Sequence, residues 1–283
     1  MKYGLAGINV GGLAVPAVGR IAELAEELGY ESVWTAEHIV LPDLPAGQTE
    51  RPGAMPMLDS LVMLGYVAAR THTLRLATGV LLLPQHEPLL LAKQLASLDV
   101  VCQGRLIVGL GVGGVEAEAK ALGVPMSERG ARAGDYVRAM QAVWTMEHPS
   151  YAGKYATFEG INAFPRPVQQ PHPPLVFGGR APAVLRRTLR YGAGWYGWGM
   201  DVEGTRSVLA SLAAAAQTVQ RPAGLGKLEI TIAPRESLTP DVIAAYHELG
   251  VERLLLRLPS LSPLEDIEAA IRGHAPEKLG QPS

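Results

Sequence analysis

Residues 15–42, VPAVGRIAELAEELGYESVWTAEHIVLP, contain a helical pattern followed at once by a strand pattern. In Val15–Leu28 one face is apolar and another is charged, as in a helix that covers a core. The apolar face is Ile21, Leu24, Ala25 and Leu28, and the charged face is Arg20, Glu23 and Glu27. Gly29 suits a left-handed helix end, and Ser32–Thr35 is short and apolar, as expected of a strand covered on both faces. The stretch predicts one helix–strand unit of an α/β protein.

The same alternation runs along the whole chain. Short apolar strands are expected at Tyr3–Asn9, Ser32–Thr35, Leu74–Leu83, Leu106–Leu110, Leu175–Phe177, Ala193–Trp198, Leu228–Ala233 and Arg253–Leu258. Helices are expected at Val15–Leu28, Asp59–Arg70, Pro88–Val101, Arg129–Met146, Pro182–Tyr191, Val202–Thr218, Pro240–Leu249 and Pro263–Arg272. Eight strands alternating with eight helices predict an α/β fold of the (β/α)8 TIM-barrel type. A doubly wound parallel sheet is the alternative, since the same alternation serves both.

Two segments interrupt this rhythm. Residues 147–173 are rich in Pro, Gly and aromatic residues, and they predict an insertion with a small hairpin after the fourth helix. Residues 41–59 form a long loop directly after the opening stretch. In a barrel both are expected over the carboxyl ends of the strands, where active sites form. Without linkers or low-complexity tails, residues 1–283 are expected to form a single domain.

Composition and net charge disfavour several classes of function. The chain of 283 residues has a formal net charge of -2, which gives no basic surface for nucleic acid or anionic membranes. The single cysteine, Cys102, excludes an internal disulfide framework and favours a reducing, cytoplasmic location. No signal peptide and no membrane span are expected, because the apolar runs are too short. A small-molecule substrate is therefore the expected partner.

Glycine clusters follow two of the expected strands. Gly109–Gly114 satisfies G-x-G-x-x-G, but no helix opens there at once and no acid ends a second strand about 20 residues on. A dinucleotide fingerprint is thus disfavoured, while close approach of this backbone to some ligand, or an inert tight turn, remains open. Phe177-Gly178-Gly179-Arg180 lies between a strand and a helix, where free N–H groups and Arg180 suit a phosphate. The alternative is a plain turn with a solvated arginine.

Other polar and aromatic candidates are fewer. Glu37 and His38 end the second expected strand, where an imidazole that titrates near neutral pH could act in catalysis or could simply cap a loop. The run Trp195–Trp198 could wall a planar ligand or fill the barrel core. No metal site is expected, because the seven histidines show no paired spacing and lack cysteine partners. His86-Glu87 is interpreted as a loop pair.

Several motifs together resemble the luciferase-like monooxygenase superfamily. Trp34-Thr35-Ala36-Glu37-His38 is similar to its W-x-x-[DE]-H segment, and Thr78-Gly79-Val80-Leu81 to its third-strand segment. Further motifs in the same order are Ala92–Asp99, Gly104–Leu106, Gly109–Gly113, Ala121–Pro125, Pro165–Pro167, Gln170–Pro174 and Gly178-Gly179, so the resemblance spans about residues 1–200. The sequence looks most like the branch of oxidoreductases that depend on the deazaflavin coenzyme F-420.

The resemblance implies a coenzyme, F-420 or alternatively FMN, at the carboxyl mouth of the barrel. It implies a cis peptide at Gly79–Val80 against the ring of the coenzyme, and a proton-transfer role for His38 with Glu37 as its orienting or structural neighbour. The residues implied to bind the coenzyme are Gly79, Val80, Gly111, Val112, Gly113, Phe177, Gly178, Gly179, Arg180 and Trp195. Because Glu37 occurs where F-420 branches often carry Asp and flavin branches Glu, the choice of coenzyme stays open.

Three functions are therefore weighed. The leading one is hydride transfer between F-420 and a small organic substrate, with His38 giving or taking the proton at the reacting carbon. The second is an FMN-dependent monooxygenase that uses reduced flavin and oxygen. The third is a barrel that binds the coenzyme without catalysis. A homodimer is expected from family practice, and the substrate cannot be named from the sequence.

Overall fold

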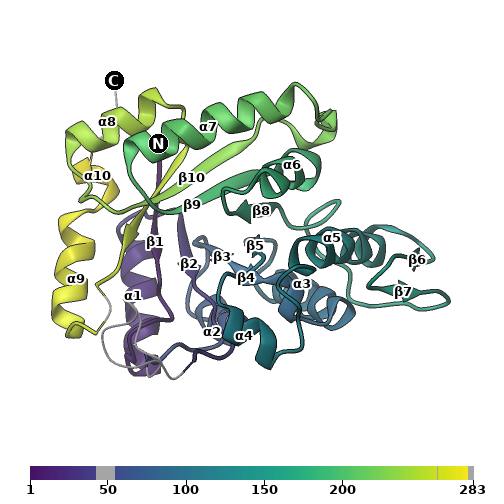
Figure 1. Ribbon diagram of the computed structural model, residues 1–283. Coiled ribbons are helices and arrows are strands. Elements are labelled where there is room, and N and C mark those ends of the chain that lie inside the picture. The colour runs from purple at the N-terminus through teal and green to yellow at the C-terminus, as the bar shows by residue number, and fades with distance from the viewer. Residues whose placement is uncertain (43–54, 260, 280–283) are drawn as a thin grey trace.

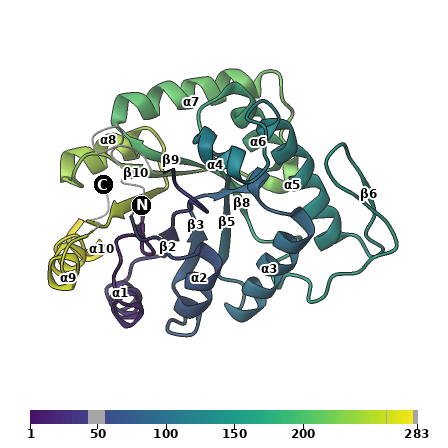
Figure 2. The same cartoon turned by 60° about the horizontal axis from the view of Figure 1, so that its bottom comes forward.

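The computed structural model describes residues 1–42, 55–259 and 261–279, and its parallel strands close into a barrel surrounded by helices (Figure 1, Figure 2). The strands are β1 (Lys2–Ala6), β2 (Ser32–Thr35), β3 (Arg75–Thr78), β4 (Leu81–Leu82), β5 (Leu106–Gly111), β8 (Leu175–Gly178), β9 (Gly194–Met200), β10 (Glu229–Pro234) and β11 (Arg253–Arg257). Around the barrel the order is β1, β2, β3, β5, β8, β9, β10, β11, and β11 pairs back with β1. The expected (β/α)8 barrel is confirmed, and the doubly wound sheet is excluded because the strands close.

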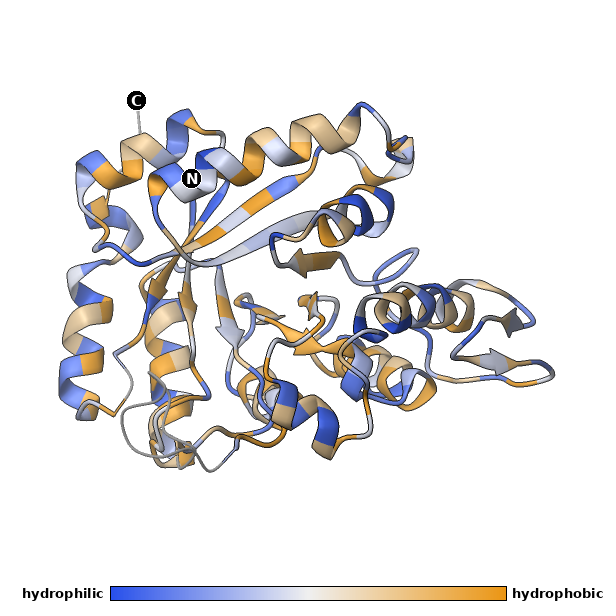
Figure 3. Cartoon of the chain, viewed as in Figure 1, coloured by the Kyte–Doolittle hydropathy of each residue, from blue (hydrophilic) through white to orange (hydrophobic). Residues whose placement is uncertain are grey.

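Helices cover the outside of the barrel. They are α1 (Val15–Glu27), α2 (Ser60–Ala68), α3 (Pro88–Val101), α4 (Glu116–Ala121), α5 (Arg129–Thr145), α6 (Pro182–Tyr191), α7 (Val202–Ala216), α8 (Pro240–Glu248), α9 (Leu264–Gly273) and α10 (Pro276–Leu279). Most strands are apolar while the helices carry polar and apolar sides, as Figure 3 shows. In the described part of the chain no helix is both long and apolar enough to cross a membrane.

Three local features differ from or refine the sequence prediction. The third strand is broken, because β3 ends at Thr78 and β4 resumes at Leu81 after a cis peptide at Gly79–Val80. The short helix α4 was not expected between the glycine cluster and α5. The predicted hairpin is present as β6 (Tyr151–Ala152) and β7 (Thr157–Phe158), but it projects beside α5 (Figure 1) and does not line the cavity at the carboxyl ends, where it was expected. Residues 43–54 of the expected long loop lie outside the described residues.

The interior of the barrel is filled by one compact layer of side chains. Trp34 from β2 and Tyr196 from β9 stack across it, with ring centroids 5.2 Å apart and planes inclined by 16°. The layer is completed by Ala6, Ala77, Ile107, Val176, Ala233 and Leu255. The barrel is therefore a packed core and not an open channel.

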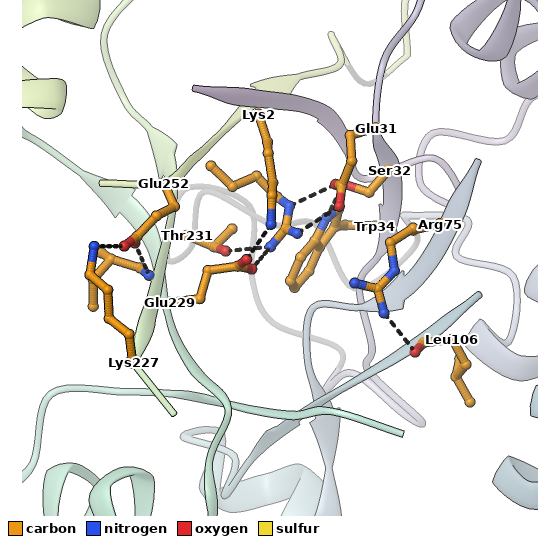
Figure 4. Close-up of polar contacts among 12 residues, drawn as sticks. Lys2, Glu31, Ser32, Trp34, Arg75, Leu106, Lys227, Glu229, Thr231 and Glu252 are labelled. Atoms are coloured by element: carbon orange, nitrogen blue, oxygen red, sulfur yellow. Dashed lines mark hydrogen bonds and ion pairs between the residues drawn. The ribbon is translucent and has the colours of Figure 1, made fainter. Parts of the chain in front are cut away.

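An ion-pair network closes the amino end of the barrel (Figure 4). The fully buried guanidinium of Arg253 donates to both carboxylate oxygens of Glu31 at 2.8 Å, to Thr231 at 2.9 Å, and to Glu229. Lys2 also reaches Glu229, at 2.5 Å. Burial opposes charge here, but the ion pairs outweigh it, so the pKa values of Glu31 and Glu229 are lowered and that of Arg253 is raised. The main cavity opens at the opposite end.

Candidate functional site

A cavity of about 700 Å³ lies at the carboxyl ends of the barrel strands. Its wall is formed by residues of β4 and β9 and by residues that end or follow β2, β3, β8, β10 and β11. They are Ala36, Glu37, His38, Gly79, Val80, Leu82, Gly178, Gly179, Arg180, Trp195, Tyr196, Gly197, Trp198, Gly199, Met200, Arg235 and Arg257. This is the end of the barrel at which enzymes of this fold place their chemistry.

His38 lines the cavity and is held from behind by a carboxylate. Its Nδ1 lies 3.0 Å from Oε2 of Glu118 in α4, and its side chain is 15% exposed. The other oxygen of Glu118 accepts the backbone N–H of Ile39 at 2.8 Å. The Glu118 side chain is fully buried, so a glutamate from another element fixes both the ring and the backbone after it.

Sequence reasoning missed Glu118. It lies in the run EAEAKA, where the exposed Glu116 two residues earlier looks the same in the sequence. Only the tertiary structure, in which α4 brings Glu118 against His38, distinguishes Glu118 from Glu116.

Glu37 points to a different partner. Its carboxylate accepts the backbone N–H of Leu82 at 2.5 Å and lies 3.0 Å from Nε2 of His86. Its side chain is only 6% exposed. Glu37 therefore ties the end of β2 to the segment after the cis peptide, and the carboxylate beside His38 is that of Glu118. His86, interpreted from the sequence as part of a loop pair, belongs to this tie.

The side chain of Val80 lies so close to Gly111 and Gly178 that it leaves little room for a side chain at either position. A Cβ added at Gly111 would lie 2.5 Å from Cγ2 of Val80, and one added at Gly178 would lie 3.1 Å from its Cγ1. At Gly109 an added Cβ would lie 1.8 Å from the carbonyl oxygen of Thr78. The first glycine cluster is thus packed against the chain's own third strand. The cis peptide that the resemblance implied is present.

Aromatic side chains form the floor and one rim of the cavity. Trp195 is fully buried and its Nε1 donates to the carbonyl of Gly179 at 2.8 Å, which anchors the glycine turn after β8. Tyr196 belongs to the packed barrel layer below. Trp198 is 39% exposed and carries the guanidinium of Arg257 4.8 Å from its ring centroid. The run Trp195–Trp198 is therefore both core and cavity wall.

Three arginines surround the mouth. Arg235 donates from Nε to the carbonyl of Gly199 at 3.1 Å and lies 3.8 Å from Asp201. Among the residues that the structure describes, Arg180 and Arg257 form no ion pair. Arg180 also precedes α6, whose N-cap residue Ala181 offers no side-chain hydrogen bond to the first turn. The mouth can therefore receive an anionic group, which would gain from both guanidinium and helix N-terminal donors.

The structure divides the predicted site residues into two groups. Those that line the cavity are Glu37, His38, Gly79, Val80, Gly178, Gly179, Arg180 and Trp195. Those outside its wall are Gly111, Val112, Gly113 and Phe177. Phe177 is 2% exposed and packs in the core, because alternate side chains of β8 point away from the barrel axis. Gly111 packs on Val80, which itself lines the cavity.

The comparisons with known proteins agree with this geometry. A family model described as luciferase-like monooxygenase matches residues 5–279. The chain belongs to this family, and it is an enzyme of the oxidoreductase and monooxygenase type.

Individual relatives use two coenzymes. An uncharacterised protein of Mycobacterium tuberculosis is 33% identical over 271 residues, which cover 93% of each chain. An F-420-dependent glucose-6-phosphate dehydrogenase of Kineococcus radiotolerans is 33% identical over 196 residues, 66% of this chain and 55% of that one. An FMNH2-dependent dimethylsulfone monooxygenase of Pseudomonas putida is 28% identical over 200 residues, 70% of this chain and 52% of that one.

Solved structures share the fold. An F-420-dependent secondary alcohol dehydrogenase, solved with an F-420–acetone adduct, superposes with a TM-score of 0.80 at 15% identity, over 99% of each chain.

Proposed function

We propose that the protein transfers a hydride between coenzyme F-420 and a small organic substrate. The observation that carries this proposal is the 700 Å³ cavity, whose wall combines apolar side chains with His38 and three arginines. Apolar walls suit a planar ring system, and guanidinium groups suit phosphates and carboxylates. The F-420-dependent relative has the higher identity, 33% over 196 residues against 28% over 200 residues for the FMNH2-dependent one.

The residues present fit such a coenzyme. Gly79 and Val80 would support its ring, because they lie in the cavity wall and carry no or only a short side chain. Gly178, Gly179 and Arg180 would hold its phosphate at the amino end of α6. Trp195 would act through Gly179, whose carbonyl it binds. When bound, F-420 supplies the hydride chemistry that the side chains of a protein lack.

His38 would handle the proton that accompanies the hydride. In the oxidising direction it takes a proton from the substrate, and in the reducing direction it returns one. The tie between Glu37, Leu82 and His86 would keep the end of β2 and the segment after Val80 in register. Trp198 and Tyr196 would exclude water from the reacting atoms.

Titration of the purified protein with F-420 and, separately, with FMN tests the coenzyme. We expect saturable binding of F-420, measured by the quenching of its fluorescence. We expect FMN to bind more weakly or not at all. Tight binding of FMN with none of F-420 would overturn the proposal and favour an FMN-dependent monooxygenase. That alternative is supported by the family description and by the Pseudomonas relative.

The assembly and the domain are proposals as well. We propose that residues 1–283 act as one luciferase-like domain and that two copies form a homodimer. Exposed apolar side chains on α2 and α3 support the second point, since Val62 is 74% exposed and Leu90 is 58% exposed. Light scattering after gel filtration would measure the mass in solution, and a monomer at micromolar concentration would contradict the dimer.

A further inference from the structure

The buried carboxylate of Glu118 uses both of its oxygens on the segment that carries His38. Oε1 accepts the N–H of Ile39 at 2.8 Å, and Oε2 lies 3.0 Å from Nδ1 of His38. In the described residues, His38 is the one side chain that pairs with this carboxylate. A buried carboxylate without a lysine or arginine partner needs strong hydrogen-bond donors, which makes both contacts important.

The chemistry of the two groups determines where the imidazole proton lies. An ionised carboxylate can only accept hydrogen bonds. Nδ1 of His38 must then carry a hydrogen to make the contact, which leaves the basic lone pair of the neutral ring on Nε2. The same contact fixes the orientation of the ring relative to the cavity that His38 lines.

We infer that Glu118 is a positioning residue that holds His38 in the Nδ1–H tautomer, with Nε2 as the atom that exchanges protons with the substrate. This inference rests on the proposed function for its catalytic meaning, but the tautomer itself can be measured without coenzyme or substrate. α4, absent from the sequence prediction, would then be the element that prepares the proton-transfer residue.

The test is nitrogen NMR on protein labelled with ¹⁵N-histidine, at about pH 8.5, where an ordinary imidazole is neutral. The signals of His38 are assigned by their loss in His38→Gln. In the wild-type protein we expect protonated Nδ1 and unprotonated Nε2. In Glu118→Gln, the amide oxygen is needed by the N–H of Ile39, so the amide NH2 faces Nδ1. A donor at that position switches the ring to the Nε2–H tautomer.

Glu116→Gln is the matched control, because Glu116 lies in the same helix but is exposed. It should leave the His38 signals unchanged. Unprotonated Nδ1 in the wild-type protein would overturn the inference even if Glu118→Gln did not fold. An unchanged tautomer in a folded Glu118→Gln would overturn it too.

Once turnover is measured, Glu118→Gln should lower kcat about 10²-fold, the lower range for acid–base catalysis, with an unchanged Kd for the coenzyme. If FMN is the true coenzyme, the tautomer result still stands. Failure of the proposed function can therefore be distinguished from failure of the inference about Glu118.

Discussion

At the scale of single residues, neighbours in the sequence have separate tasks. Glu37 and His38 are adjacent and both line the cavity, yet Glu37 binds the segment after the cis peptide while His38 pairs with Glu118. Val80 also has two kinds of neighbour, since it lines the cavity and its side chain packs against Gly111 and Gly178. Each of these assignments leads to a substitution with a matched control.

Replacing His38 by alanine should lower kcat by about 10² to 10⁴ while the affinity for the coenzyme changes little, because the proposed acid–base catalysis would be lost and the turn at Gly178–Arg180 is untouched. Steady-state kinetics and coenzyme titration would measure the two effects. His72→Ala is the control, since His72 is exposed and contacts Glu26 only through its backbone. Unchanged kcat in His38→Ala would show that the assigned role is wrong.

Replacing Gly111 by alanine should destabilise the protein by about 1–3 kcal/mol, because the new Cβ would lie 2.5 Å from Cγ2 of Val80. Val80→Ala in the same chain should remove most of that loss, which a double-mutant cycle in urea would measure. Gly114→Ala should be nearly neutral, since no atom of the described residues lies within 4 Å of its added Cβ. Additive losses at Gly111 and Val80 would contradict the proposed contact.

At the scale of elements, the ends of helices and strands do most of the positioning. α4 brings Glu118 to His38, and the broken third strand brings Val80 and Leu82 to the cavity. On the outside of the barrel, Glu26 near the end of α1 accepts the N–H groups of His72, Thr73 and Leu74, which lead into β3. Although burial opposes its charge, these hydrogen bonds lower the pKa of Glu26 to about 2.

Glu26→Gln should therefore reduce the stability by about 1 kcal/mol at pH 7, a value kept small because the group is partly exposed to solvent. A carboxylate whose pKa is lowered by folding stabilises the protein fully above its ordinary pKa of 4.5. The contribution is lost as the pH falls towards 2, so wild type and variant should converge in acid. Urea unfolding at several pH values would measure this. The exposed Glu27→Gln is the control, and a difference that grew in acid would refute the argument.

At the scale of the whole molecule, an ion-pair network closes the amino end of the barrel, and the cavity lies at the carboxyl end. Arg253 joins the amino end of β11 to Glu31 before β2 and to Glu229 in β10. The stacked Trp34 and Tyr196 separate this network from the active-site end. The buried ion-pair network and the cavity thus lie at opposite ends of the strands.

Replacing Arg253 by methionine should cost about 3–5 kcal/mol, because it leaves two carboxylates without their buried partner. Removing both charges as well, in the triple variant with Glu31→Gln and Glu229→Gln, should recover part of the loss. Thermal and urea unfolding would measure both variants against Arg206→Met, whose side chain is 59% exposed. A loss under 1 kcal/mol in Arg253→Met would mean that the network adds little.

The sequence by itself determined an α/β fold of alternating strands and helices, because that alternation is a local pattern, and it favoured the barrel over a doubly wound sheet. It also determined that His38 and the turn at Gly178–Arg180 lie at one end, since the carboxyl ends of parallel strands meet there. The short helix α4 was not predicted, because six residues show too little periodicity to indicate a helix.

Only the tertiary structure decided which side chains meet. Glu118 is 80 residues from His38 in the chain, and Glu31 is 222 residues from Arg253. In the same way, Gly111 and Gly178 meet Val80 from two other strands, and Arg180, Arg235 and Arg257 gather at one mouth. Such contacts depend on the closure and register of the barrel. Closure brings distant strands together, and no local pattern in the sequence records which of their residues will face each other.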